Sequence, residues 1–128
     1  MSQLRIFIAD PNRSSRLALQ MLLDHEPGMQ VVGIAVQLEG LLEQITAVHP
    51  DVILIDWQLI VPDPEEHISD LHRHTSQCHI IVLDIRSETE EKALDSGADA
   101  FVGKNVPPDR LLQILRKLNQ KEVKRNSK

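Results

Sequence analysis

Five short apolar runs set the fold of this chain of 128 residues. They recur at regular intervals, are rich in Ile, Val and Leu, and are nearly continuous: LRIFIA (4–9), MQVVGIA (29–35), DVILID (51–56), HIIVLD (79–84) and AFVG (100–103). Unbroken apolar runs of this length are typical of strands that are buried on both faces of a parallel sheet. Parallel strands cannot be joined by tight turns, so the segments between them must cross over the sheet.

The segments between the runs have helical spacing. Leu19, Leu22 and Leu23 occupy positions i, i+3 and i+4 of a helix over 13–24, and Asn12 before it is a suitable N-cap. Similar patterns predict helices over about 37–49, 64–73, 87–96 and 107–119. Strands that alternate with crossover helices form a parallel sheet with helices on both faces. We therefore expect a three-layer α/β fold of five βα units.

Two of these helices carry recognisable start signals. Asp63 followed by Pro64 has the pattern of an N-cap with proline at the first helical position. Ser87 and Glu90 have the spacing of a capping box, in which the serine side chain accepts from the helix and the glutamate reaches back. These signals predict helices that begin at about 64 and 87.

The length corresponds to one domain, which we place at 1–119. Residues 120–128 form a basic tail or the start of a linker to a further domain. The last eight residues, KEVKRNSK, hold four basic side chains and one acid, yet the whole chain has a net charge of −5, so its body is acidic. An acidic body with 2% aromatic residues suits neither phosphate-backbone binding nor base stacking. We therefore expect no nucleic-acid binding by this domain itself.

The cellular compartment is indicated by three absences in the sequence. Cys78 is the single cysteine, so one chain can form no disulfide, as is usual in a reducing cytosol. No apolar stretch approaches the roughly 18 residues of a transmembrane helix. The first apolar run meets Asp10 too early for a signal peptide. These features predict a cytoplasmic protein that does not contact a membrane.

Charged side chains end several of the predicted strands. Asp10 follows the first, Asp56 ends the third, Asp84 ends the fourth and Lys104 follows the fifth. The carboxyl ends of parallel strands meet at one edge of a sheet, where open α/β proteins place their sites. Clustered carboxylates can hold Mg²⁺, and one of them can act as a nucleophile towards a phosphoryl group. A lysine beside them can bind a phosphoryl oxygen as a point charge.

These residues stand in motifs that resemble the receiver domain of two-component response regulators over about 4–118. The matching segments are IFIAD (6–10), Arg16, PDVILIDW (50–57), HIIVLD (79–84), GADAFVGK (97–104) and PPDRLLQIL (107–115). EPGMQVVGIA (26–35) is most similar to the subgroup that carries C-terminal helix-turn-helix domains. The resemblance implies a flavodoxin-like fold with a sheet of order 2-1-3-4-5. It also implies a signalling module, not an enzyme, that accepts a phosphoryl group from a sensor histidine kinase with the help of Mg²⁺.

The resemblance also assigns roles to individual residues. Asp56 matches the phosphoacceptor, and Asp10 matches an acid that holds Mg²⁺ together with it. Lys104 matches the lysine that contacts the phosphoryl group. Gln58 matches the residue whose backbone carbonyl completes the metal shell. Phe101 stands at the aromatic switch position of the fifth strand.

The chain departs from the family pattern at several of these positions. Pro11 replaces the second acid of the first strand, so the metal site loses a ligand and a charge. Asp84 replaces the Ser or Thr that binds the phosphoryl group and would repel that group. Other departures are Ile85 in place of a small residue, Asn105 in place of a proline, and Ile60 and Pro64 in a loop that lacks the usual Pro and Gly. Mg²⁺ binding is therefore expected to be weak or lost.

Asp84 allows two interpretations. It could supply the metal oxygen that Pro11 removes, or it could pair with Lys104 and hold the switch in one state without phosphate. We favour the pair with Lys104, because it requires no bound ion.

Three functions remain open from the sequence. The first is a receiver that relays signals through phosphorylation of Asp56, weakly if at all. The second is a phosphorylation-independent receiver that acts as a protein-interaction or dimerisation module with a signalling protein. The third is a small-ligand binder on the same fold. A homodimer through the face at 87–119 is a further expectation, because an acidic ridge there adjoins a basic helix: Glu88, Glu90 and Glu91 against Arg110, Arg116 and Lys117.

Overall fold

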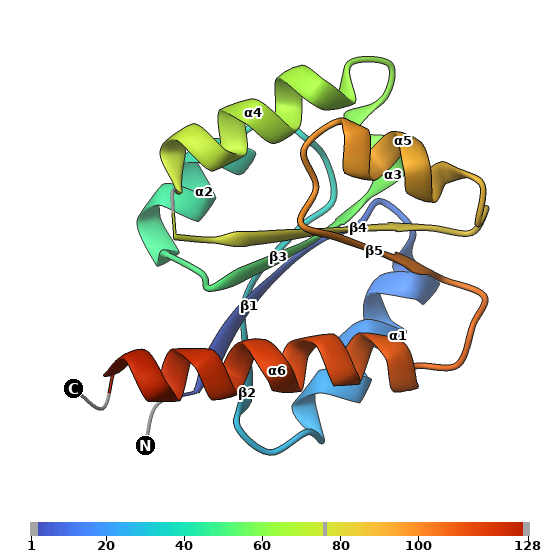
Figure 1. Cartoon of the computed structure of the whole chain (residues 1–128). Coiled ribbons are helices and arrows are strands. Elements are labelled where there is room, and N and C mark those ends of the chain that lie inside the picture. The colour runs from blue at the N-terminus through green and yellow to red at the C-terminus, as the bar shows by residue number, and fades with distance from the viewer. Residues whose placement is uncertain (1–2, 76, 127–128) are drawn as a thin grey trace.

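The computed structural model describes residues 3–75 and 77–126, and this part of the chain contains five strands and six helices (Figure 1). The strands are β1 (Leu4–Ala9), β2 (Met29–Ala35), β3 (Val52–Asp56), β4 (His79–Asp84) and β5 (Ala100–Gly103). The helices are α1 (Arg13–Asp24), α2 (Leu41–Val48), α3 (Trp57–Ile60), α4 (Pro64–His74), α5 (Thr89–Asp95) and α6 (Asp109–Asn126). Strands and helices alternate as the apolar pattern predicts.

The strands form one parallel sheet of order β2-β1-β3-β4-β5, which confirms the expected topology. β1 lies between β2 and β3, so the winding of the chain changes direction between β1 and β3. Such a reversal opens a crevice at the carboxyl ends of the two strands, because their crossover connections leave in opposite directions. Asp10 and Asp56 stand at those two strand ends.

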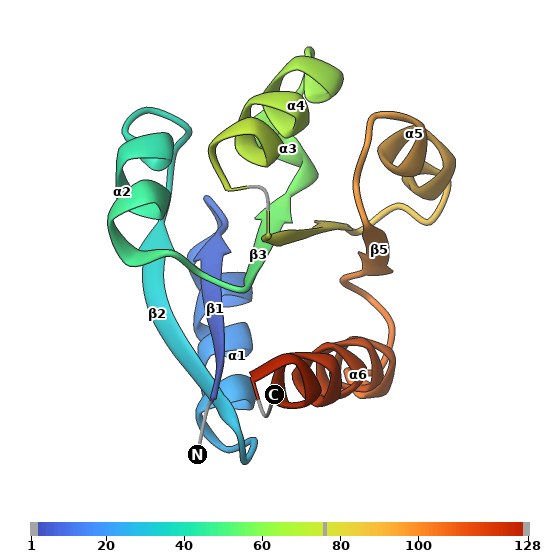
Figure 2. The same cartoon turned by 60° about the vertical axis from the view of Figure 1, so that its left-hand side comes forward.

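The helices cover both faces of the sheet and bury an aliphatic core on each (Figure 2). On one face, Leu41 of α2, Ile68 of α4 and Ala93 of α5 pack against the sheet. On the other face, Leu23 of α1 and Leu115 of α6 are fully buried. Burial on both faces explains why the strand sequences are continuously apolar instead of alternating.

Helix α2 begins at Leu41, later than the expected start near residue 37. Gly40 before it has φ of +81°, in the left-handed region, which is incompatible with a right-handed helix at that residue. Leu38 lies outside the helix but still packs against the core, so its apolar character reflects burial and not helical periodicity.

The start signals of α4 and α5 are only partly confirmed. Pro64 is the first residue of α4 and Asp63 occupies its N-cap position, although the Asp63 side chain makes no capping hydrogen bond. The capping box is wrong: α5 begins at Thr89, and the N–H of Glu90 donates to the backbone carbonyl of Ser87, not to its side chain. The polar side chain that matters at this helix start is that of Thr89.

Two stretches are helical where the sequence patterns gave no helix. The short α3 follows β3 directly, and α6 continues to Asn126 instead of ending near residue 119. The residues from 120 onward are rich in Lys, Glu, Gln and Arg, which favour helix, so the basic segment extends α6 as far as the described chain goes. Among the described residues, no helix is both long and apolar enough to span a membrane.

Candidate functional site

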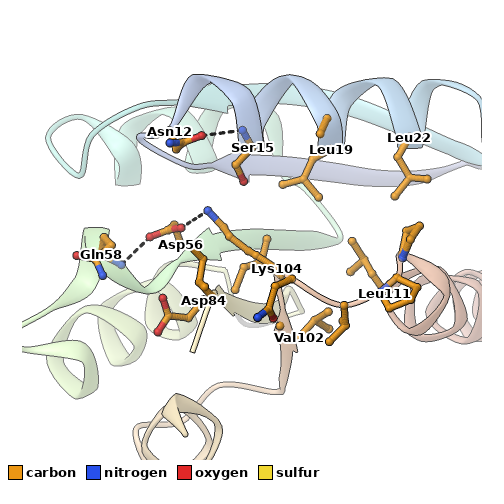
Figure 3. Close-up of a pocket in the computed structure, with 18 of the residues that line it drawn as sticks. Asn12, Ser15, Leu19, Leu22, Asp56, Gln58, Asp84, Val102, Lys104 and Leu111 are labelled. Carbon is orange, nitrogen blue, oxygen red and sulfur yellow. Dashed lines mark hydrogen bonds and ion pairs between the residues drawn. The ribbon is translucent and has the colours of Figure 1, made fainter. Parts of the chain in front are cut away.

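Three charged side chains meet where the carboxyl ends of β1, β3 and β5 come together, and Figure 3 shows two of them, Asp56 and Lys104. Asp10 follows β1 and is fully buried, and Asp56 ends β3 with 4% of its surface exposed. Lys104 follows β5 and reaches both carboxylates. The convergence expected from the sequence is therefore confirmed for these three residues.

The ammonium group of Lys104 bridges the two aspartates. Its Nζ lies 2.8 Å from Oδ2 of Asp10, to which it donates a hydrogen bond, and it forms an ion pair with Oδ2 of Asp56. Burial alone would lower the pKa of Lys104, but the hydrogen bonds to the two carboxylates and their negative charges outweigh it, so the pKa lies above its usual value. Lys104 therefore remains a cation in the folded domain.

Asp10 has a full set of hydrogen-bond donors. Oδ1 accepts from the backbone N–H of Asn12 at 2.9 Å, and Oδ2 accepts from the Ser15 hydroxyl at 2.6 Å as well as from Lys104. Asn12 is the N-cap of α1, as predicted, and its side chain accepts from the N–H of Ser15 at 2.8 Å. This cap places Ser15 in the first turn, where its hydroxyl reaches the buried carboxylate. Ser15 was not predicted, although its position three residues after the cap was a usable signal.

Asp56 is held by two contacts of different kinds. Oδ1 accepts a hydrogen bond from the backbone N–H of Gln58 at 2.7 Å, which caps the short helix α3, and Oδ2 pairs with Lys104. The resemblance assigned the backbone carbonyl of Gln58 to a metal. The structure records the N–H of Gln58 donating to Asp56, and the role assigned to its carbonyl stays a prediction.

Asp84 points to α5 and not to Lys104. Its Oδ2 accepts a hydrogen bond from the Thr89 hydroxyl at 2.6 Å and lies 3.5 Å from Nε of Arg86. The favoured pair between Asp84 and Lys104 is therefore wrong: the two residues share only a backbone hydrogen bond, from N of Lys104 to O of Asp84 at 2.8 Å. Thr89 and Arg86 lie on a helix start and a loop, and the strand-end pattern gave no indication of either.

A cavity of about 700 Å³ opens beside these charges. Asp56, Gln58 and Lys104 line its polar end, and apolar side chains of α1, β5 and α6 line the remainder (Figure 3): Leu19, Leu22, Val102 and Leu111. Ile85 also lines the cavity but is 63% exposed, so it borders the opening and does not fill it. Phe101, at the expected switch position, is 5% exposed and packs in the core.

The fold and this constellation define a class of protein. The family model for the response regulator receiver domain matches residues 6–116, and the chain belongs to that family. It is thus a receiver domain of the two-component signalling type. It is similar to protein-glutamate methylesterase/protein-glutamine glutaminase 1 of Geobacter sulfurreducens, with 33% identity over 111 residues that cover 81% of this chain and 30% of the relative.

The chain is also similar to a second curated protein and to a solved structure. The nitrate/nitrite response regulator NarL of Escherichia coli is 28% identical over 112 residues, which cover 86% of this chain and 52% of the regulator. A LuxR-family two-component response regulator from Aurantimonas has the same fold, with a TM-score of 0.80, 23% identity and coverage of 94% of this chain and 87% of that one. The chain spans about a third of the methylesterase and about half of NarL.

Receiver domains generally bind Mg²⁺ at the acidic pocket, but the side chains here do not fit the ion as they are arranged. Asp10 is occupied by three donors, Pro11 offers no side-chain oxygen, and Asp84 is turned towards Thr89. The part of the chain that the structure describes contains no group of three or more His, Cys, Asp or Glu side chains placed to hold a metal. The alternative in which Asp84 replaces the missing ligand is therefore not supported by its position.

Proposed function

We propose that this receiver domain is a signalling module that works mainly without phosphorylation. In this proposal its conformation is set by the contacts of Asp84 and not by a phosphoryl group on Asp56. The observation that carries the proposal is the contact of the Asp84 carboxylate with Thr89 and Arg86. A negative charge already stands at the end of β4 and is bound to α5. The position that in the family binds the phosphoryl group is thus occupied by a carboxylate that already has partners, Thr89 and Arg86.

The surroundings of Asp56 support the same proposal. Phosphorylation would require a carboxylate oxygen of Asp56 to attack phosphorus while the bond from phosphorus to the donor breaks. Charge develops on the transferred group during this step and is normally neutralised by a metal ion and a lysine. Here the lysine is engaged by two carboxylates and the metal ligands are incomplete. Asp84, one strand away, adds a further negative charge.

The test is labelling with a small phosphodonor. The full chain is incubated with acetyl phosphate and Mg²⁺, and the phosphorylated fraction is followed by intact mass. We expect slow or absent labelling. Rapid, stoichiometric labelling that depends on Mg²⁺ and is lost in Asp56→Asn would contradict the proposal. Asp51→Asn, which changes a partly buried acid away from the site, is a matched control for the substitution itself.

A conventional phosphorelay through Asp56 is the second candidate. It is favoured by one specific observation, namely that Asp56 and Lys104 already lie together at the strand ends. In that case the partner would be a sensor histidine kinase and Mg²⁺ would be the cofactor. The labelling experiment separates the two candidates, because only the phosphorelay requires a phosphorylated Asp56 to accumulate.

The finer assignments extend the same proposal. We place the domain in the cytoplasm, where receiver domains meet their signalling partners, and assign it no enzymatic turnover of its own. The similarity to the methylesterase covers 30% of that protein, so it supports a shared receiver module and gives no support to methylesterase activity in this chain. Its partners are a kinase or another signalling protein, with a second copy of the chain as a further candidate.

A further inference from the structure

The cavity beside the acidic pocket has the size and the lining of a small-molecule site. Its volume of about 700 Å³ lies within the range of about 300–1,000 Å³ that is usual for ligand pockets. Most of the side chains that line it are apolar, and charged groups stand at one end only. The cavity therefore has room for an organic molecule that is apolar over most of its length and polar at one end.

The apolar end of the cavity lies between α1 and the start of α6. Leu19 and Leu22 point from α1 towards apolar side chains of β5 and α6, namely Val102 and Leu111 (Figure 3). Leu19 and Leu22 pack against the core but remain partly exposed, and Val106 at the edge of the cavity is 45% exposed. Removal of this apolar surface from water is favourable, so this end of the cavity favours a hydrocarbon group.

The polar end of the cavity carries more negative than positive charge. Asp56 and Asp84 line it, and Asp10 is buried next to Asp56. The cations paired with these three carboxylates are Lys104 and Arg86. Three carboxylates with two cations leave one negative charge without a counter-ion among the described residues. A ligand that completes this balance carries a single positive charge.

The oxygen that is open to such a ligand is Oδ1 of Asp84. Both recorded contacts of the Asp84 side chain, with Thr89 and Arg86, are made by Oδ2. Within residues 3–75 and 77–126, Oδ1 accepts no hydrogen bond, yet no fully buried polar side-chain atom there lacks a partner, so Oδ1 is accessible. Arg16 does not reach it, because its guanidinium donates to the backbone carbonyl of Asp10. An ionised oxygen without a donor is a strong acceptor for an ammonium group.

We propose that this cavity binds a small organic monocation, a primary amine with an apolar body. The ammonium group donates to Oδ1 of Asp84, and the hydrocarbon body lies between α1 and α6 against Leu19 and Leu22. Lys104 keeps its own two carboxylates, so the amine does not displace it. The site goes beyond the proposed function, since it is formed whether or not Asp56 is phosphorylated. It places a ligand on the residue whose contact with Thr89 holds the start of α5.

The experiment is an NMR titration of the full chain with hexylamine at neutral pH, read at the backbone amides. We expect saturable shifts at the residues that line the cavity, Val102 and Leu111 among them, with a dissociation constant of about 1 mM. Affinity should depend on chain length, because each buried CH₂ group adds to binding. Butylamine should bind more weakly than hexylamine and octylamine more tightly, by about fourfold for each CH₂.

Hexanol and hexanoate test the charge, because they offer a similar hydrocarbon chain with a neutral or a negative head. Hexanol should bind about fivefold or more weakly than hexylamine, since a hydrogen bond from an ammonium group to a carboxylate is stronger than one from a neutral hydroxyl. Hexanoate should bind more weakly still, because its carboxylate is repelled by Asp84.

Three variants of the chain locate the two ends of the ligand. Asp84→Asn keeps the shape of the side chain and should lower the affinity for hexylamine to that for hexanol, with hexanol unaffected. Ala18→Phe introduces a large side chain at an exposed position of α1 that lines the cavity, so it should weaken binding of both compounds. Ala47→Phe makes the same change at an exposed position of α2, outside the cavity, and should behave like the wild type.

Three outcomes would overturn the proposal. The first is a titration with hexylamine that gives no saturable shifts at the residues lining the cavity. The second is a wild type that binds hexanol or hexanoate as tightly as hexylamine, because the site would then not select a cation. The third is hexylamine binding that neither Asp84→Asn nor Ala18→Phe weakens. No phosphodonor enters these titrations, so failure of this proposal is distinguishable from failure of the proposed function.

Discussion

The hydroxyl of Thr89 donates a hydrogen bond of 2.6 Å to the carboxylate of Asp84, and both side chains are buried. The bond joins the end of β4 to the first residue of α5. A hydrogen bond to an ionised acceptor is short and about twice as strong as one between neutral groups. The bond therefore fixes the start of α5 to the sheet through side chains of the protein alone, without a phosphoryl group.

Removal of the Thr89 hydroxyl should destabilise the domain. Thr89→Val keeps the shape of the side chain but leaves the buried Asp84 carboxylate without its strongest donor, which we expect to cost about 1–3 kcal/mol in the free energy of unfolding. Urea unfolding measures this change. Thr46→Val, at an exposed position of α2, is the matched control and should remain within about 0.5 kcal/mol of the wild type.

A double-mutant cycle assigns that loss to the contact itself. If Thr89 acts through Asp84, the cost of Thr89→Val should shrink in an Asp84→Asn background, where the charged acceptor is gone. Equal costs in the two backgrounds would show that the hydroxyl stabilises α5 by another route.

Restoring the family residues should make Asp56 easier to phosphorylate. The double change Pro11→Asp with Asp84→Thr adds a metal ligand and removes a repelling carboxylate, so the rate of labelling by acetyl phosphate in Mg²⁺ should rise about tenfold or more. Intact mass follows the reaction over time. A double variant that is labelled no faster than the wild type would locate the obstacle elsewhere, for example in the engagement of Lys104 by Asp10.

The sequence predicted which residues meet at the site better than it predicted the contacts that their side chains make. Strand-end positions depend on the apolar runs, so the meeting of Asp10, Asp56 and Lys104 could be expected before any coordinates. The partner of Asp84 could not, because it depends on which way a side chain turns in a crowded pocket. Lys104 pairs with two other carboxylates, and the hydroxyl that Asp84 contacts is that of Thr89, the first residue of α5.

The ends of the helices were also harder to predict from the sequence than the helices themselves. Periodicity located α2 correctly but not its first residue, which is set by the left-handed Gly40. The helix α6 continues through the basic segment because no proline or glycine interrupts it. The boundary that we drew at residue 119 rested on charge, whereas helix termination depends on backbone conformation and capping.

Cys78 should be chemically inert in the folded protein. Burial raises the pKa of its thiol to about 12, so very little thiolate exists near neutral pH. Iodoacetamide labelling should be slow at pH 8 and become faster as the pH rises towards that pKa, provided that the fold persists. In urea the rate should rise to that of an ordinary free cysteine. Fast labelling of the folded chain at pH 8 would contradict this prediction.

The expected homodimer requires a revised charge pattern. Within one chain, Arg110 lies 3.8 Å from Glu90, and Arg116 makes a bidentate pair with Glu26 at 2.7 and 3.0 Å. The hydrogen bond to Arg116 lowers the pKa of Glu26, so this pair persists at neutral pH. The two arginines thus have partners in their own chain and contribute less to an intermolecular contact than the sequence pattern suggests.

If the dimer forms through the face at 87–119, the acids of α5 that have no such partner should control it. We therefore expect Glu91→Lys to weaken association more than Glu90→Lys, because Glu91 is exposed and the structure records no ion pair for it within the described chain. Sedimentation velocity across micromolar concentrations measures the monomer–dimer equilibrium, and association should weaken as salt is added. Glu43→Lys, at an exposed position of α2 on a different helix, controls for the change in net charge. A chain that stays monomeric at high micromolar concentration, or a dimer that is indifferent to Glu91→Lys, would remove this face from consideration.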